Sequence, residues 1–192
     1  SSIIKMILPI VAYGSSILHE KCKDIQPEYP DLKNLIDNMF DTMYNARGVG
    51  LAAPQINTAI RLFIVDTNPF FNNEEEQEGN PIKKVFINPN ITKEEGEKEL
   101  FNEGCLSIPE IREDINRKPK ITIEYLDEEF NNCKEEYDGV NARVIQHEYD
   151  HIEGVLFTDK LSPLRKRMLK SKLLNISKGN IEVSYRMIFP KK

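Results

Sequence analysis

The stretch "VIQHEYDHIEG", residues 144–154, holds two of the three histidines in this chain, four positions apart with a glutamate beside the first. On an α-helix, side chains at i and i+4 lie on one face with Cβ atoms about 5–6 Å apart. His147 and His151 can therefore bind one metal ion, and Glu148 lies beside them as an acid or base. The alternative is a pair of structural histidines. Flanking aliphatic residues indicate that the helix runs through the core: Val144, Ile145 and Ile152.

A third ligand must come from elsewhere, because a catalytic metal site typically has three protein ligands and an open position. His19 stands beside charged residues and is expected at the surface. Cys105 is the better candidate, since "EGCLSIP" at 103–109 places its thiol where the chain would emerge from a strand or a loop. A thiolate next to a divalent cation is deprotonated and binds it well. Asp150 points to another helix face, where a supporting carboxylate is at least as reasonable as a ligand.

Length, charge and cysteine content limit the class of protein. The 192 residues suffice for a real core, and we expect one domain over 1–192, in which residues 1–5 could be an artificial addition before a native start at Met6. The net charge of −5 argues against broad nucleic-acid binding, which needs a basic face. No apolar run approaches the roughly 20 residues that cross a bilayer, so no membrane association is expected. Three cysteines without a CxxC pair indicate reduced thiols and a cytoplasmic location.

Hydrophobic periodicity predicts an α+β fold, with mostly antiparallel β-sheets packed around a central helix that carries the histidines. Helices are predicted over 31–45, over 139–152 and in a basic segment within 161–176. Strands are predicted at 60–67, at 82–89, once or twice within 97–108, as a hairpin over 120–138, and in the C-terminal tail at 181–190. The apolar face of the basic segment is expected to carry Leu164, Met168 and Leu173. The acidic run Glu74–Glu78 is expected in a surface loop.

Three short motifs then narrow the function. They are "GVGLAAPQ" at 48–55, "EGCLSIP" at 103–109 and "QHEYDHIEG" at 146–154. In this order they resemble the three signature motifs of the peptide deformylases, and the likeness extends over at least residues 7–163. The resemblance implies a hydrolase that removes the formyl group from the N-terminal formylmethionine of newly made polypeptides and releases formate.

The resemblance also implies a role for each polar residue of the motifs. Cys105, His147 and His151 would hold one divalent metal ion per chain, usually Fe²⁺ in this family, with Ni²⁺, Co²⁺ or Zn²⁺ as alternatives. The Cys/His/His donor set itself suits several of these ions. Glu148 would act as general base and then as general acid.

Other motif positions would contact the substrate. Gln55 and the backbone N–H of Leu106 match the family positions that stabilise the tetrahedral oxyanion. Gly48 and Gly50 leave room for an extended peptide beside them, although Gly48 could equally be a helix C-cap. The remaining positions assigned to substrate binding are Val49, Gly104, Arg112 and Ile145, of which Arg112 is almost as reasonable as a plain surface arginine.

The chain departs from the family pattern in three places. Arg143 stands where well-known members carry an apolar residue at the entrance of the methionine pocket, so it could reshape the rim or bind a neighbouring carboxylate. The acidic insertion at 72–79 lengthens a loop near the cleft. The basic cluster within 161–172 could dock on the ribosome, as the C-terminal helix of bacterial relatives does, although a solvated helix face is the simpler interpretation.

Two other functions share the histidine spacing. A zinc endopeptidase uses the same acid and ligand pair, but its third ligand normally follows the helix, whereas Cys105 precedes it. A non-catalytic module with a structural metal would need four protein ligands, and no fourth cysteine or histidine is well placed. Both alternatives therefore fit the sequence less well than a deformylase.

Overall fold

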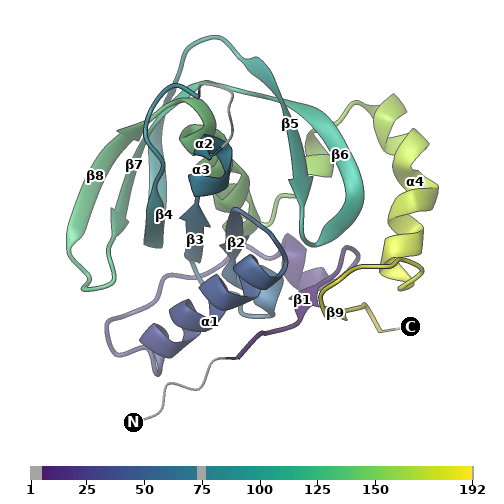
Figure 1. The fold of residues 1–192 in the computed structure, drawn as a ribbon, viewed down its shortest axis with the longest axis horizontal. Helices are drawn as coiled ribbons and strands as arrows, with labels where there is room; N and C mark the ends of the chain where they lie inside the picture. The colour runs from purple at the N-terminus through teal and green to yellow at the C-terminus, as the bar shows by residue number, and fades with distance from the viewer. Residues whose placement is uncertain (1–5, 73–76, 192) are drawn as a thin grey trace.

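The computed structural model describes residues 6–72 and 77–191 and has the predicted α+β fold (Figure 1). Its largest sheet is antiparallel, with the strand order β2-β3-β4-β7-β8. These strands are β2 (Gly50–Ala52), β3 (Leu62–Asp66), β4 (Lys83–Glu95), β7 (Lys120–Leu126) and β8 (Asn132–Tyr137). The expectations for residues 1–5 and for most of the acidic run, 74–76, lie outside the described residues.

The remaining elements surround this sheet. Strands β5 (Glu99–Cys105) and β6 (Ile108–Arg117) form a separate antiparallel hairpin, and β1 (Ile10–Val11) pairs in parallel with β9 (Met187–Ile188). The helices are α1 (Leu32–Asn45), α2 (Asn68–Phe71), α3 (Gly139–Ile152) and α4 (Pro163–Ser177), with 3₁₀ turns at Ser16–His19, Ala53–Ile56 and Phe157–Lys160. Within the described ranges, no helix has the length and apolar character that a membrane crossing requires.

Strand β3 is buried along its whole length because both faces of the large sheet are covered. Leu62 and Ile64 belong to the apolar cluster that includes the buried side of α1. Phe63 and Val65 point to the opposite face and belong to the cluster that includes α3. A strand covered on both faces reads as a continuous apolar run, which is how residues 62–65 appear in the sequence. Helix α3 is therefore a core helix, as predicted.

The hairpin predicted over 120–138 is confirmed, whereas three other strand predictions need correction. Strand β4 continues to Glu95 and pairs with β7 through two irregularities in register. The segment 97–108 holds β5 and only the first residue of β6, a long strand that was not predicted. The tail strand predicted over 181–190 is limited to Met187–Ile188, because β1 offers only two residues for pairing.

The buried face of α4 also differs from the prediction. Leu164 and Met168 are 62% and 60% exposed, and of the three predicted core residues only Leu173 is buried. Leu169, Leu173 and Ile176 instead form the buried stripe, at the i, i+4, i+7 spacing of one helix face. They pack with isoleucines of β6, which the sequence had not identified as a strand. The buried face of α4 was therefore predicted wrongly because strand β6, which covers it, was not predicted.

Candidate metal centre

Three ligand atoms converge where the β5–β6 hairpin meets helix α3. The sulfur of Cys105, at the end of β5, and one ring nitrogen each of His147 and His151 all lie within 4.8 Å of one another. Cys105 Sγ is 3.3 Å from His151 Nε2, and the two imidazole centroids are 5.1 Å apart. The structure therefore brings together the three residues that the sequence predicted as ligands.

The β5–β6 hairpin aims Cys105 at the helix. Its pairing register shifts between Gly104 and Cys105, and Cys105 then pairs with Ile108 across a two-residue turn. A register irregularity of this kind bends a strand and redirects a side chain. The two turn residues, Leu106 and Ser107, directly follow the ligand Cys105.

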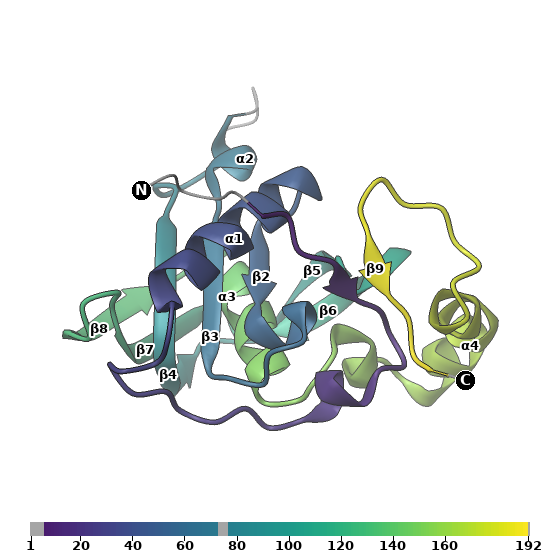
Figure 2. The same ribbon diagram turned by 90° about the horizontal axis from the view of Figure 1, so that it is seen from below.

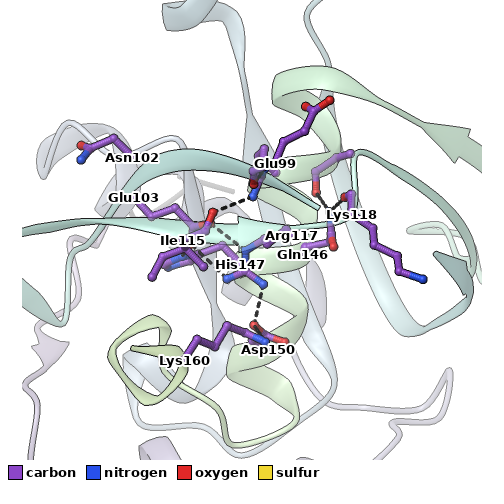
Figure 3. Close-up of polar contacts among 12 residues, drawn as sticks. Glu99, Asn102, Glu103, Ile115, Arg117, Lys118, Gln146, His147, Asp150 and Lys160 are labelled. Carbon is purple, nitrogen blue, oxygen red and sulfur yellow. Dashed lines mark hydrogen bonds and ion pairs between the residues drawn. The ribbon is translucent and has the colours of Figure 1, made fainter. Parts of the chain in front are cut away.

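A buried ionic chain orients His147 (Figure 3). The ring Nδ1 lies 2.9 Å from Glu103 Oε1, so Nε2 faces the other two ligands. Arg117 binds both oxygens of Glu103, at 2.7 and 3.0 Å, and donates to Asp150 Oδ2 at 2.8 Å. Lys160 lies 3.5 Å from the same Asp150 oxygen. Asp150 is therefore a supporting carboxylate rather than a ligand, which was the simpler of the two interpretations.

The charged groups around His147 and His151 favour the binding of a cation by these two side chains. Burial opposes ionisation of Glu103, but the hydrogen bonds from His147 and Arg117 outweigh it and lower the pKa of Glu103 to about 2. Burial likewise opposes a proton on His147, yet its contacts with Cys105 and Glu103 raise its pKa, so a cation at Nε2 would replace a proton. Burial and the neighbouring His147 lower the pKa of His151 and keep that ring neutral, the form that binds metals.

Glu148 is a buried carboxyl group beside the ligands, with its side chain only 4% exposed. Its Oε1 lies 3.8 Å from His147 Nε2, whereas Oε2 has no hydrogen-bond partner among the described residues. Burial raises the pKa of Glu148 to about 7. A Cβ atom on Gly50 would lie 2.8 Å from Glu148 Cγ, so the glycine makes room for this carboxyl group. Gly50 thus has a role that the sequence analysis had not assigned to it.

These observations test whether a metal ion fits the site. A thiolate and two imidazoles form a donor set for a divalent ion such as Zn²⁺, Fe²⁺, Co²⁺ or Ni²⁺. The buried Oε2 of Glu148 and Nδ1 of His151 are the two side-chain polar atoms in the described ranges that are fully buried without a partner. Because such atoms are rare in folded proteins, the unpartnered Oε2 of Glu148 beside three convergent ligands supports one divalent metal ion. Nδ1 of His151 points away from the site, since Nε2 of that ring faces Cys105.

A cavity of about 690 Å³ opens next to the ligands. Most residues predicted to contact the substrate line it: Gly48, Val49, Gly50, Gln55, Gly104, Leu106 and Arg112, together with Cys105, His147 and Glu148. Ile145 does not, and this prediction is corrected. It is fully buried between α3 and the large sheet, while Val144, one residue or about 100° earlier on the helix, lines the cavity.

Gln55 is fixed by three hydrogen bonds. Its Oε1 accepts from the backbone N–H of Ala52 at 3.0 Å. Its Nε2 donates to Ser107 Oγ at 3.1 Å and lies 3.5 Å from Cys105 Sγ. These contacts assign the amide orientation, because the oxygen has a donor and the nitrogen has acceptors. The N–H groups of Gln55 therefore face the ligand side of the cavity.

The other two predicted glycines make room for protein side chains. A Cβ atom on Gly48 would lie 2.7 Å from Leu106 Cδ1, and one on Gly104 would lie 2.6 Å from Arg112 Nη1. Gly48 also donates to the carbonyl of Met43 after the end of α1, although the residue with positive φ at this helix end is Arg47. Close packing and helix termination therefore both apply at Gly48.

The sequence did not predict the contacts of two arginines near the cavity. Arg112 is exposed, lines the cavity and donates to Asn102 Oδ1 at 2.7 Å, so its contact with the substrate stays a prediction. Arg143, expected at the pocket rim or on a carboxylate, lines the cavity but donates to the backbone carbonyls of Glu99 and Ile115. Its guanidinium lies 5.7 Å from the ring centroid of Phe101.

Sequence reasoning missed Glu103 and Arg117. Glu103 stood inside a quoted motif without a role, and Arg117 belongs to the strand that was not predicted. The available signal was chemical, because a histidine that binds a metal usually donates its second N–H to a carboxylate or a carbonyl. The choice of Glu103 among the many acidic residues depends on the tertiary structure.

Comparisons with known proteins agree with this geometry. The family model described as polypeptide deformylase matches residues 7–167. The peptide deformylase of Christiangramia forsetii is 60% identical over 190 residues, covering 96% of this chain and 97% of the relative. That of Flavobacterium johnsoniae is 56% identical and covers 96% of both chains.

Solved structures lead to the same family. A peptide deformylase from Legionella pneumophila superposes with a TM-score of 0.78 at 36% identity, covering 91% of this chain and 98% of that one. The enzyme from Thermus thermophilus superposes with a TM-score of 0.79 at 36% identity, covering 91% and 99%. The length of these matches and their identity, added to the Cys/His/His centre, show that this chain belongs to the polypeptide deformylase family.

Proposed function

We propose that this peptide deformylase acts on the N-terminal formylmethionine of nascent polypeptides and that Glu148 is its acid–base group. The observation that carries the proposal is the buried carboxyl oxygen of Glu148, which lacks a partner among the described residues and lies beside three convergent metal ligands. A general base must lie within reach of the proton that it removes. Glu148 lines the cavity next to the ligands, which supports that role.

Proton transfer by Glu148 accounts for both halves of the hydrolysis. A divalent ion, when bound, supplies Lewis-acid activation of the water and of the carbonyl group. Glu148 takes the proton of the attacking water and returns it to the leaving amine. Because burial raises its pKa to about 7, the carboxyl group is able both to accept and to release a proton near neutral pH.

The developing oxyanion needs hydrogen-bond donors that are fixed in advance. We propose Gln55 Nε2 and the backbone N–H of Leu106 for this role. Gln55 is held by Ala52 and Ser107, and Leu106 belongs to the tight turn after Cys105. Both residues line the cavity together with the ligands Cys105 and His147.

We propose that the substrate contacts come from residues that line the cavity. Val49 and Val144 offer an apolar surface for the methionine side chain, and both line the cavity. Gly48, Gly50 and Gly104 also line the cavity, and we propose that their backbone groups pair with an extended peptide. Arg112, anchored to Asn102 at the cavity, is proposed to contact the peptide beyond methionine.

We propose Fe²⁺ as the ion in the cell. A thiolate and two imidazoles are suitable ligands for Fe²⁺, Ni²⁺, Co²⁺ and Zn²⁺, so the donor set supports one divalent ion without selecting it. Elemental analysis of protein purified without oxygen is the measurement. Iron at about one atom per chain would support the proposal, and zinc at that level would contradict it.

Release of formate from formyl-Met-Ala-Ser tests the function. We expect turnover of this peptide and loss of at least about 100-fold in kcat/KM for acetyl-Met-Ala-Ser, because the added methyl group crowds the reacting carbon in a confined cavity. The acetyl peptide is the matched control. Cleavage of internal peptide bonds in a longer unformylated peptide would instead favour the zinc endopeptidase, and binding of metal without any hydrolysis would favour a structural module.

The exposed face of α4 suggests a partner in the cell. Leu164 and Met168 are exposed there, next to exposed basic residues that include Arg167 and Lys170. We propose that this face docks on the ribosome, whose RNA is acidic, in the cytoplasm. Charge reversal at Arg167 and Lys170 should abolish co-sedimentation with ribosomes and leave formate release from a short peptide unchanged. Co-sedimentation equal to that of the unchanged protein would contradict the proposal.

A further inference from the structure

The chain after α4 returns to the active site and forms one wall of its cavity. After α4 the tail forms a loop and returns to β9, which pairs with β1 through Ile10 with Met187 (Figure 2). Just before β9, three consecutive residues line the cavity: Val183, Ser184 and Tyr185. The proposed function uses none of them. The same observation supports the proposal that the tail and the preceding chain act as one catalytic domain.

Tyr185 is the residue of this wall that reaches the catalytic turn. Its hydroxyl donates to the carbonyl oxygen of Leu106 at 2.7 Å. Its ring is partly buried and packs against the core cluster that includes α1. Burial raises the pKa of Tyr185, so the hydroxyl stays protonated and remains a donor.

The turn that receives this bond has few other restraints. It comprises two residues, Leu106 and Ser107, between the paired Cys105 and Ile108. The backbone N–H of Tyr13 donates to the Ser107 carbonyl at 2.9 Å, and Gln55 donates to Ser107 Oγ at 3.1 Å. Both of these bonds hold Ser107. The bond from Tyr185 holds the carbonyl of Leu106.

We infer that Tyr185 is a positioning residue, which fixes the Leu106 backbone so that its N–H faces the reacting carbonyl group. The inference rests on the proposed function of the Leu106 N–H. Holding the carbonyl of Leu106 restrains its ψ angle, and the paired Cys105 restrains the preceding peptide, so the N–H between them keeps one direction. An oxyanion donor that is already oriented is worth far more than one that must reorient during the reaction.

The variant Tyr185→Phe removes the hydroxyl and keeps the ring. We expect kcat for formyl-Met-Ala-Ser to fall about tenfold, while KM stays within about twofold, because the donor acts on the transition state rather than on the bound substrate. Metal content and the midpoint of urea unfolding should remain close to those of the unchanged protein. Tyr137→Phe is the matched control, since that hydroxyl donates to Glu135 in β8, away from the cavity, and its loss should leave kcat unchanged.

Two further readouts separate positioning from general stability. Replacing Tyr185 by 4-aminophenylalanine keeps an N–H donor at the same place and should restore most of the lost kcat. In the metal-free chain, the amide resonance of Leu106 should shift or broaden in Tyr185→Phe and stay unchanged in Tyr137→Phe. This second readout does not depend on catalysis.

The outcomes distinguish this inference from the proposed function. If the unchanged protein releases no formate, the proposed function fails, while the Leu106 resonance still reports whether Tyr185 orders the turn. An unchanged kcat in Tyr185→Phe would overturn the inference. So would a rise in KM at constant kcat, which would make the tail a wall for the substrate only. Failure of 4-aminophenylalanine to restore kcat would likewise contradict it.

Discussion

Glu148→Ala should retain its metal ion and lose nearly all turnover. The variant leaves the ligand atoms of Cys105, His147 and His151 in place, so about one ion per chain should remain bound. Removal of the buried carboxyl group deletes the only acid–base group that we assign, and general acid–base catalysis typically contributes about 10²–10⁴-fold. We therefore expect kcat for formyl-Met-Ala-Ser to fall by about 10³-fold.

A matched control is available at the end of the same helix. Glu153 follows α3, pairs with Arg61 at 3.3 Å and does not line the cavity. Glu153→Ala should therefore keep its metal and a kcat within about twofold of the unchanged protein. Formate release and elemental analysis on both variants are the measurements. Full activity in Glu148→Ala would exclude this carboxyl group as the general base.

Cys105→Ala should lose its metal ion. The thiolate is one of three protein ligands, and loss even of a residue that only supports a ligand commonly costs 10–100-fold in affinity. We therefore expect the affinity for the ion to fall by more than about 100-fold, with turnover lost in the same proportion. Because the buried imidazoles of His147 and His151 remain, a weak residual site should persist at high metal concentration.

Cys133→Ala provides the control for this experiment. Cys133 is a free thiol on β8 and is not one of the convergent ligands. Its removal should leave metal binding and turnover unchanged. Metal affinity measured with a competing chelator decides between the two variants. An equal affinity in Cys105→Ala and in the unchanged protein would mean that another residue supplies the third ligand.

The sequence predicted the elements that depend on local pattern. Helix α3 and the β7–β8 hairpin follow from apolar spacing and from a polar turn, and both are confirmed. The three ligands and Glu148 could be predicted because their residue types and the four-residue histidine spacing restrict the chemistry. The Glu103–Arg117 pair could not, since it depends on how the β5–β6 hairpin lies against α3.

The wrong predictions depend on tertiary contacts. Strand β6 carries the exposed charges Glu110 and Arg112 between its buried isoleucines, so its apolar pattern is weak. Without that strand, the stripe of α4 that would be covered was unknown, and Leu164 was placed in the core although it is exposed. Ile145 was predicted to line the cavity in place of Val144 for a similar reason. The spacing of apolar residues defines a helix face, but it does not show how the helix is rotated relative to the cavity.

The dependence on tertiary contacts also explains why the C-terminal tail was predicted only as a strand. The pairing of β9 with β1 helps to bring Tyr185 to Leu106, a residue 79 positions away in sequence. No local pattern indicates such a contact. Residues that a motif contains could be assigned from the sequence, whereas residues that support the motif from distant segments required the structure.

The central claim is that one metal ion, held by Cys105, His147 and His151, and the carboxyl group of Glu148 together hydrolyse a formyl group. Anaerobic titration of the metal-free chain with Fe²⁺, during continuous measurement of formate release from formyl-Met-Ala-Ser, tests it most directly. We predict that the rate rises linearly from near zero and levels off at one ion per chain, and that Glu148→Ala stays inactive throughout. Formate release without metal, or a plateau that requires more than one ion per chain, would contradict the account.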